Sequence, residues 1–211
     1  MIKKITRKKM RNFLSKYKTD KKVLDIGSGG SSYGDFFPNR LCVDIDVSRG
    51  PDIVADAHNL PFEDNEFEFV LSTEMLEHVQ DPFQVEKEMR RVLAPGGTLV
   101  LSTRFIFPLH DTPNDYWRFT KYGLKELFKE WDILEIQPET ENFTTLGVLL
   151  QRMCYQSNFK LNKLTKACLF FVAWVLSHFD WLIKEEFGDI KKSCLEKGLM
   201  PSGYYLVCKK R

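Results

Sequence analysis

Three acidic side chains lie at or beside the ends of short apolar segments early in the chain: Asp25, Asp44 and Asp56. Apolar segments of four to eight residues bounded by turn residues are typical of buried strands. Parallel strands end at the same edge of a sheet, and ligands bind at that edge, so we expect the three carboxylates to face one site. There they can accept hydrogen bonds from hydroxyl and amino groups of a ligand.

A glycine-rich turn, with Gly27, Ser28 and Gly29, follows the first apolar segment. Glycine lacks a Cβ and tolerates positive φ, so the backbone can approach a ligand closely. A dinucleotide-binding pattern needs a further glycine where this chain has Ser32, and Asp25 would repel a pyrophosphate. The turn therefore favours a ligand with a nearby positive charge, such as an amine or a sulfonium. The alternative is a tight strand–helix turn that binds nothing.

Five sequence blocks occur in a fixed order. They are Leu24–Gly29, Val43–Asp46, Asp52–Ala57 with Leu60–Phe62, Phe67–Ser72 with Leu76–Val79, and Leu93–Leu99. Together they resemble the class I S-adenosylmethionine-dependent methyltransferases, particularly the type 11-like branch with a short core methyltransferase domain. The resemblance extends over about residues 20–137, a little over half of the chain.

This resemblance implies that S-adenosylmethionine is the cofactor, and it assigns the contacts. Asp25 would accept a hydrogen bond from the methionine amino group, directly or through water. Asp44 would bind the ribose hydroxyls, with Asp46 as a close competitor because the register of a short strand is uncertain by a residue. Asp56 and the backbone of Ala57 would bind the adenine, although Asp56 could instead cap a loop.

The remaining cofactor contacts surround the methyl group. Gly27, Ser28 and Gly29 would form the floor of the site, and Thr73 and Glu74, after the fourth strand, would border the transferred methyl. A sulfonium is already an activated methyl donor, so the protein must mainly align the acceptor and exclude water.

Two histidines are candidate general bases. A hydroxyl acceptor must lose a proton, and histidine is the side chain best matched to neutral pH. The candidates are His78, before the helix that Asp81 opens, and His110, in the loop after the fifth strand; a structural hydrogen bond is the alternative for His78. The five cysteines are odd in number and lack Cys-x-x-Cys spacing, which indicates a reducing, cytoplasmic compartment, and we expect no metal site.

The loop 104–120 is long and rich in polar and aromatic residues, and such loops often carry function. Aromatic faces beside carboxylates suit a sugar, and the segment 115–120 is similar to one in methyltransferases of surface-polysaccharide biosynthesis. We expect three of its residues to contact the acceptor: Asp115, Tyr116 and Arg118. The alternative is that Trp117 and Phe119 pack under the sheet while Arg118 pairs with Asp115.

The hydrophobic pattern predicts alternating strands and helices. Strands are expected over 22–27, 41–45, 52–55, 67–72, 98–103, 131–137 and 203–209, and helices over 5–17, 33–37, 81–93 and 122–129. The pattern indicates an α/β fold, a doubly wound Rossmann-like sheet of seven mostly parallel strands. The resemblance implies that the last strand is antiparallel. We expect one methyltransferase domain over 1–211, with a basic amino-terminal helix at 1–20 and an apolar helical insert at 142–200.

The insert contains ten consecutive apolar residues, 167–176, preceded by Lys160, Lys163 and Lys166. Ten helical residues reach about 15 Å, half of the ~30 Å hydrocarbon core, so they cannot span a bilayer. An interfacial membrane helix, a buried helix, a lid over the substrate and a homodimer interface all remain open. Residues 1–22 carry ten basic side chains and one acid, a cluster that anionic lipid would attract, and the alternative is a solvated helix that covers one edge of the sheet.

The leading functional hypothesis is methyl transfer to oxygen of a small-molecule, glycan or lipid-linked acceptor. Alternatives are an RNA methyltransferase and a non-catalytic S-adenosylmethionine-binding module. Subtracting the +9 of residues 1–22 from the chain's +2 leaves −7 for the rest, which argues against nucleic acid. The chain also lacks the Asn/Asp-Pro-Pro-aromatic and Pro-Cys motifs of nucleic-acid methyltransferases.

Overall fold

The computed structural model describes residues 4–30 and 33–211. The chain divides into two compact units. The sheet unit comprises Arg11–Arg104, Leu109–Gln137 and Tyr204–Arg211, and the helical unit comprises Met1–Met10, Phe105–Pro108 and Pro138–Gly203. Each unit is described separately below, and the prediction of one methyltransferase domain over the whole chain remains a prediction.

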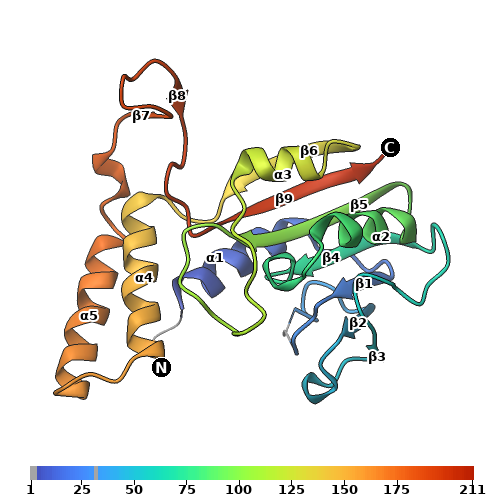
Figure 1. Cartoon of the computed structure of the whole chain (residues 1–211), viewed down its shortest axis with the longest axis horizontal. Coiled ribbons are helices and arrows are strands. Elements are labelled where there is room, and N and C mark those ends of the chain that lie inside the picture. The colour runs from blue at the N-terminus through green and yellow to red at the C-terminus, as the bar shows by residue number, and fades with distance from the viewer. Residues whose placement is uncertain (1–3, 31–32) are drawn as a thin grey trace. The chain divides into compact units, whose positions relative to one another are not determined.

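A seven-stranded sheet has the order β3-β2-β1-β4-β5-β9-β6 (Figure 1). The strands are β1 Val23–Ile26, β2 Arg40–Asp44, β3 Ile53–Val54, β4 Phe67–Thr73, β5 Leu93–Arg104, β6 Trp131–Pro138 and β9 Gly203–Lys210. β1 pairs in parallel with β2 and β4, and the pairs β2–β3 and β4–β5 are also parallel. Antiparallel strands lie near the end of the sheet, so the predicted Rossmann-like fold is confirmed.

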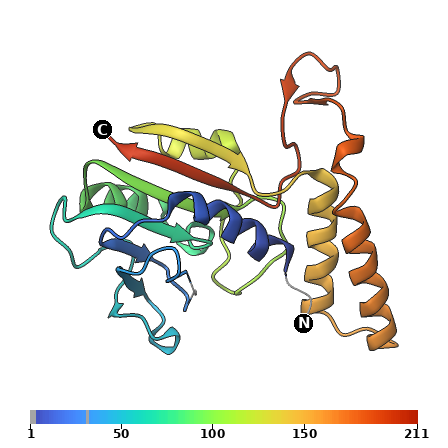
Figure 2. The same cartoon turned by 180° about the vertical axis from the view of Figure 1, so that it is seen from behind.

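Helices α2 (Pro82–Val92) and α3 (Lys121–Leu127) lie on the face of the sheet seen in Figure 1. The Asp81 carboxylate caps α2 by accepting from the backbone N–H of Phe83 (3.0 Å) and Gln84 (3.1 Å). On the opposite face, seen in Figure 2, Phe13 in the last turn of α1 (Ile5–Leu14) stacks on Tyr205 of β9, with the ring centroids 4.2 Å apart. Helices on both faces leave the strand ends open for a ligand.

The prediction of a helix over 33–37 is wrong. The structure has turns there, in which the N–H groups of Phe36 and Phe37 both bond to the carbonyl of Tyr33 (2.9 and 3.1 Å). Phe37 is fully buried, with its ring 5.6 Å from that of Phe69. Five residues containing a glycine are too short to propagate a helix, so burial of the aromatic side chains decides the local conformation.

The helical unit contains α4 (Asn142–Gln156) and α5 (Asn162–Leu176), followed by the 3-10 helix Asp180–Leu182 and a hairpin of β7 (Glu186–Phe187) and β8 (Leu195–Glu196). Gly147 allows α4 to approach α5 closely, because a Cβ there would lie 2.7 Å from the carbonyl oxygen of Ala173. The predicted apolar segment 167–176 lies within α5. Among the residues with assigned positions, none of the helices has both the length and the hydrophobicity needed to cross a membrane.

Candidate functional site

A cavity of about 630 Å³ opens at the carboxyl ends of β1, β2 and β4, entirely within the sheet unit. This volume lies in the range of small-molecule and cofactor sites. The residues that matter most for its chemistry are Gly27, Asp44, Asp56, Glu74, His78 and Tyr116.

Gly27 forms the floor where β1 ends, and its φ of +69° is the left-handed conformation that favours glycine. A Cβ at this position would lie 2.2 Å from the Cγ of Met75. The N–H of Gly27 donates to the carbonyl of Val43 at 2.8 Å, which fixes the turn to β2. The sequence therefore places a glycine where both the backbone angle and the available space require one.

Asp44 is buried at the end of β2, and it also lines the cavity. One carboxylate oxygen accepts from the N–H of Gly29 (2.7 Å) and the other from the N–H of Asp46 (3.0 Å). Asp46 lines the cavity but is exposed, and it begins a 3-10 helix by accepting from Ser48. The hydrogen bond from Ser48 lowers the pKa of Asp46. Asp44 is thus held rigidly, whereas Asp46 is engaged in local capping.

Asp56 and Ala57 line the cavity after β3. The Asp56 carboxylate accepts from the N–H of His58 (2.9 Å) and lies 2.6 Å from the Nδ1 of that imidazole. Nε2 of His58 in turn accepts from the N–H of Asp81 (3.2 Å), which connects this loop to the start of α2. The hydrogen bonds from His58 outweigh desolvation and lower the pKa of Asp56. Asp56 therefore caps its own loop, as the alternative proposed, and it also lines the cavity.

Asp25 is fully buried, and its Oδ2 accepts from Nη1 of Arg40 at 3.0 Å. Burial raises its pKa to about 7 despite the opposing effect of Arg40. Oδ1 of Asp25 has no hydrogen-bond partner among the described residues. The described lining of the cavity does not include Asp25, Ser28, Gly29 or Thr73, all predicted as cofactor contacts. The sequence analysis missed Arg40, which could have been found only by pairing β1 with β2.

These residues fit a cationic nucleoside. The cavity has a suitable volume, a floor without a Cβ at Gly27, rigid carboxylate acceptors at Asp44 and Asp56, and a buried oxygen of Asp25 with no assigned donor at the adjoining strand end. Each of these groups accepts hydrogen bonds or attracts positive charge.

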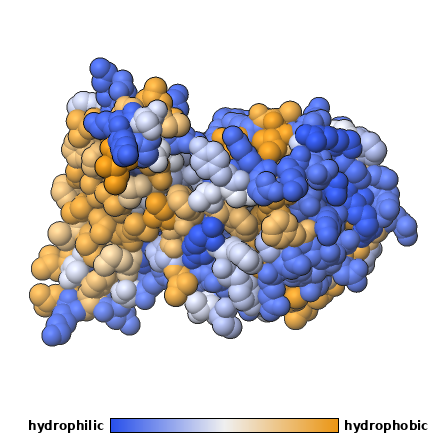
Figure 3. Space-filling view, turned by 45° about the horizontal axis from the view of Figure 1, so that its top comes forward, coloured by the Kyte–Doolittle hydropathy of each residue, from blue (hydrophilic) through white to orange (hydrophobic). Residues whose placement is uncertain are grey.

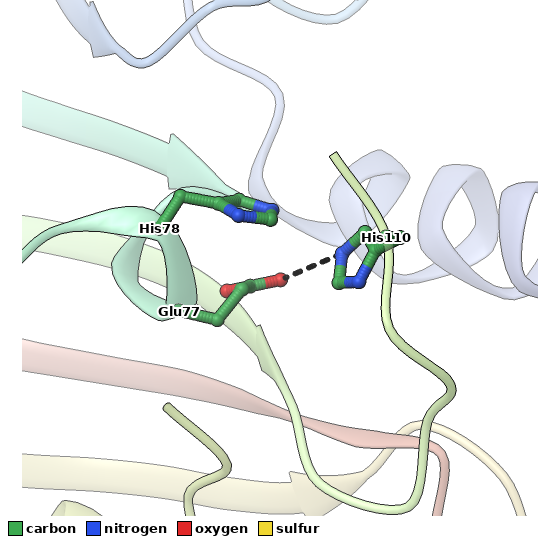
Figure 4. A group of neighbouring side chains, drawn as sticks. All are labelled: Glu77, His78 and His110. Atoms are coloured by element: carbon green, nitrogen blue, oxygen red, sulfur yellow. Dashed lines mark ion pairs between the residues drawn. The ribbon is translucent and has the colours of Figure 1, made fainter. Parts of the chain in front are cut away.

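A group of side chains beside His78, a residue of the cavity lining, was only partly predicted from the sequence. Figure 4 shows Glu77 and His78, from the 3-10 helix Leu76–His78, beside His110 of the loop 104–120. The two imidazole rings meet edge to face at 4.6 Å, and Nε2 of His110 lies 3.9 Å from Oε1 of Glu77. Glu77 is fully buried, accepts from the Thr103 hydroxyl (2.8 Å), and has a pKa that burial raises. His78 lines the cavity, whereas its described lining does not include His110.

Glu74, just after β4, adopts a φ of +54°, an unusual conformation for this residue type. Its N–H donates to the carbonyl of Ser102 at 3.0 Å, and its carboxylate pairs with the buried Arg104. Glu74 lines the cavity, so this strained backbone lies at the site.

The loop 104–120 combines both alternatives proposed for it. Arg118 pairs with Asp115 through both carboxylate oxygens (2.6 and 2.7 Å), and although burial acts in the opposite direction, this contact lowers the pKa of Asp115 to about 2. Phe119 is buried, and the indole N–H of Trp117 donates to the carbonyl of Val79 at 2.9 Å. Tyr116 lines the cavity. Of the three predicted acceptor contacts, the structure places Tyr116 at the site and pairs Asp115 with Arg118.

Comparisons with known proteins support the same interpretation. Residues 24–101 match a family model described as a methyltransferase domain. The chain is 34% identical over 104 residues to tocopherol O-methyltransferase of Arabidopsis thaliana, covering 39% of this chain and 30% of that protein. It is 34% identical over 102 residues to a ubiquinone biosynthesis O-methyltransferase of Pseudomonas aeruginosa, covering 39% of this chain and 44% of that protein. The matched region thus spans less than half of either relative.

Among solved structures, the [4+2]-cyclase SpnF has a TM-score of 0.62 at 12% identity, covering 97% of this chain and 81% of that one. At such identity the likeness concerns the fold alone. Residues 24–101 therefore have the features of a class I S-adenosylmethionine-dependent methyltransferase domain, and the cofactor of this domain is S-adenosylmethionine.

Proposed function

We propose that this chain transfers a methyl group to an oxygen atom of a small-molecule, glycan or lipid-linked acceptor. The observation that carries the proposal is a single cavity lined both by Asp44 and Asp56, here called the nucleoside end, and by Glu74, His78 and Tyr116, here called the acceptor end. When bound, S-adenosylmethionine supplies a methyl group on a positively charged sulfur.

The nucleoside end holds the cofactor. Asp44 binds the ribose hydroxyls, and Asp56 with the backbone of Ala57 binds the adenine. Asp25 attracts the methionine amino group from behind the strand ends, through its oxygen without an assigned hydrogen-bond partner. Gly27 lets the backbone approach the ligand, and Met75 beside it helps to exclude water.

The acceptor end orients a hydroxyl and takes its proton. Nδ1 of His78 lies 2.5 Å from the carbonyl oxygen of Asn114, and only a protonated nitrogen can donate to that oxygen. Nε2 of His78 is therefore the atom that accepts the proton. Tyr116 provides an aromatic face and a hydroxyl for the acceptor.

Two of the curated relatives are O-methyltransferases by name, which supports oxygen as the methylated atom. Another relative is an N-methyltransferase by name, so acceptors with an amine belong in the test. A protein with this fold is described as a cyclase, so the fold alone does not decide the reaction. A non-catalytic S-adenosylmethionine-binding module is therefore the second candidate. RNA is disfavoured by the acidic body of the chain.

The decisive experiment combines binding and transfer. Calorimetry with S-adenosylhomocysteine should detect binding by the wild-type chain, and Asp44→Ala should weaken it while Asp132→Ala, on the surface, should not. Transfer of a labelled methyl group to a panel of phenols, amines, glycans, lipid-linked sugars and RNA then identifies the acceptor. Binding without transfer to any of these acceptors would favour the non-catalytic module.

We propose further that the protein is cytoplasmic and that α5 contacts a partner. Figure 3 shows apolar residues gathered over the helical unit. On and after α5, Leu164, Phe171, Trp174 and Trp181 are 60–75% exposed, and only Ala173 is buried within the helix. The lysines at 160, 163 and 166 favour an anionic bilayer surface, and the breadth of the apolar face favours a second copy. Flotation with anionic vesicles and light scattering in solution distinguish these partners.

A further inference from the structure

One atom each from Glu77, His78 and His110 lie within 4.8 Å of one another beside the acceptor end of the cavity (Figure 4). We propose that these three side chains bind one divalent transition-metal cation of the zinc or manganese class. The sequence analysis expects no metal site, because it considers cysteine spacing and not residues that the fold brings together. As a binding site the group does not depend on the proposed function. With a cation bound, Nε2 of His78 would be a ligand and the cation, in place of this nitrogen, would promote loss of the acceptor's proton; that role rests on the proposed function.

The orientation of the two imidazoles supports the proposal. Nδ1 of His78 donates to the carbonyl of Asn114 (2.5 Å), and Nδ1 of His110 lies 3.4 Å from a carboxylate oxygen of Asp115. Histidines that bind metals usually direct their second nitrogen to a carbonyl or carboxylate in this way. Nε2 is then the nitrogen of each ring that could bind a cation.

Glu77 provides the charge. Its Oε2 accepts from Thr103, whereas its Oε1 has no hydrogen-bond partner among the described residues, although the side chain is fully buried. Oε1 lies 3.9 Å from Nε2 of His110. If Nδ1 of His110 carries the proton, Nε2 of that ring and Oε1 of Glu77 are both acceptors, and each can act as a ligand of one cation. Two ligands of one tetrahedral zinc ion are about 3.4 Å apart, so a small side-chain movement would complete the geometry.

Arg104 is the competing cation. Its Nε lies 4.0 Å from Oε1 of Glu77, but its guanidinium also pairs with Glu74. Asp115 and Arg118 neutralise each other. Around the group, Arg104 thus divides its positive charge between Glu74 and Glu77, and a bound cation would add to the balance of charge at Glu77.

The ligand set indicates both the metal class and the acceptor class. Two imidazoles and one carboxylate suit zinc, manganese or iron better than magnesium or calcium, which prefer oxygen ligands. Three protein ligands leave coordination positions open, and His78 lines the cavity. An acceptor that shares the cation must offer an oxygen ligand, such as a hydroxyl beside a second oxygen.

The test uses the full chain after chelator treatment. Calorimetry and elemental analysis with Zn²⁺ and Mn²⁺ should find one equivalent bound, and cobalt substitution should produce visible absorption bands. His78→Ala and His110→Ala should each weaken binding at least about 10-fold. His178→Ala is the matched control, because this histidine lies on the helical unit.

Glu77→Gln tests the carboxylate, provided that circular dichroism confirms folding; otherwise the two histidine variants decide. If the wild-type chain binds no metal, or binds it as well as His78→Ala and His110→Ala do, Arg104 alone balances Glu77 and the inference is wrong. Binding of S-adenosylhomocysteine is measured in parallel. If the wild-type chain binds S-adenosylhomocysteine but no metal, only this inference is wrong. If it does not bind S-adenosylhomocysteine, the proposed function is wrong.

Discussion

The two ends of the cavity are built in different ways. At the nucleoside end, the Asp44 carboxylate accepts hydrogen bonds from two backbone N–H groups. One belongs to Asp46, two residues further along the chain, and the other to Gly29 in the glycine turn. At the acceptor end, His78 and His110 are 32 positions apart, and the loop 104–120 brings them together. Under the proposed function, backbone N–H groups near Asp44 would shape cofactor recognition, whereas long-range packing of the loop 104–120 would shape acceptor chemistry.

The largest effect is expected at the acceptor end. His78→Ala should lower kcat about 10²–10⁴-fold, the usual contribution of a general base, because Nε2 no longer accepts the proton. Affinity for S-adenosylhomocysteine, measured by calorimetry, should be unchanged. Equal losses in both quantities would show that the two ends are not separable.

Asp25 should give the chain a distinctive pH dependence. Its pKa is about 7 when folded and about 4 when unfolded, so the folded chain binds the proton more tightly. The free energy of unfolding contributed by Asp25 is therefore greatest below pH 4 and decreases as the pH rises to 7, by at most about 4 kcal/mol. Asp25→Asn cannot ionise and should lack this decrease. Urea unfolding at pH 4 and 8 checks the prediction, and parallel pH profiles for the two proteins would contradict it.

Asp44→Ala should weaken S-adenosylhomocysteine binding about 100-fold, because a charged acceptor of two ribose hydroxyls is lost. Calorimetry measures the effect, with Asp132→Ala as the control for an exposed carboxylate. A similar loss from Asp46→Ala and none from Asp44→Ala would transfer the ribose role to Asp46.

Gly147→Ala should act only on the helical unit. The new methyl group would meet the carbonyl of Ala173 at 2.7 Å, and such overpacking typically costs about 1–3 kcal/mol. Chemical unfolding should detect the loss, and cofactor affinity should not change. Gly34→Ala is the matched control, since no atom lies within 4 Å of its Cβ position. Loss of cofactor binding in Gly147→Ala would show that the helical unit is coupled to the cavity.

Much of the sheet unit follows from local sequence. The predicted strand ends differ from β1, β2 and β4 by one residue at most, and Asp81 begins α2 as expected. The missing helix at 33–37 is the main failure, because short segments take their conformation from the core that they contact.

The sequence by itself indicated the fold class and placed carboxylates at strand ends, because apolar periodicity, glycine turns and strand-end acids are separated by short stretches of chain. Its resemblance to a known family implied the cofactor. Only the tertiary structure decided that Arg40 forms an ion pair with Asp25 and that Arg118 forms one with Asp115. It alone brought Glu77 between His78 and His110. Contacts between residues distant in the chain depend on how strands and loops pack, and no spacing along the sequence encodes them.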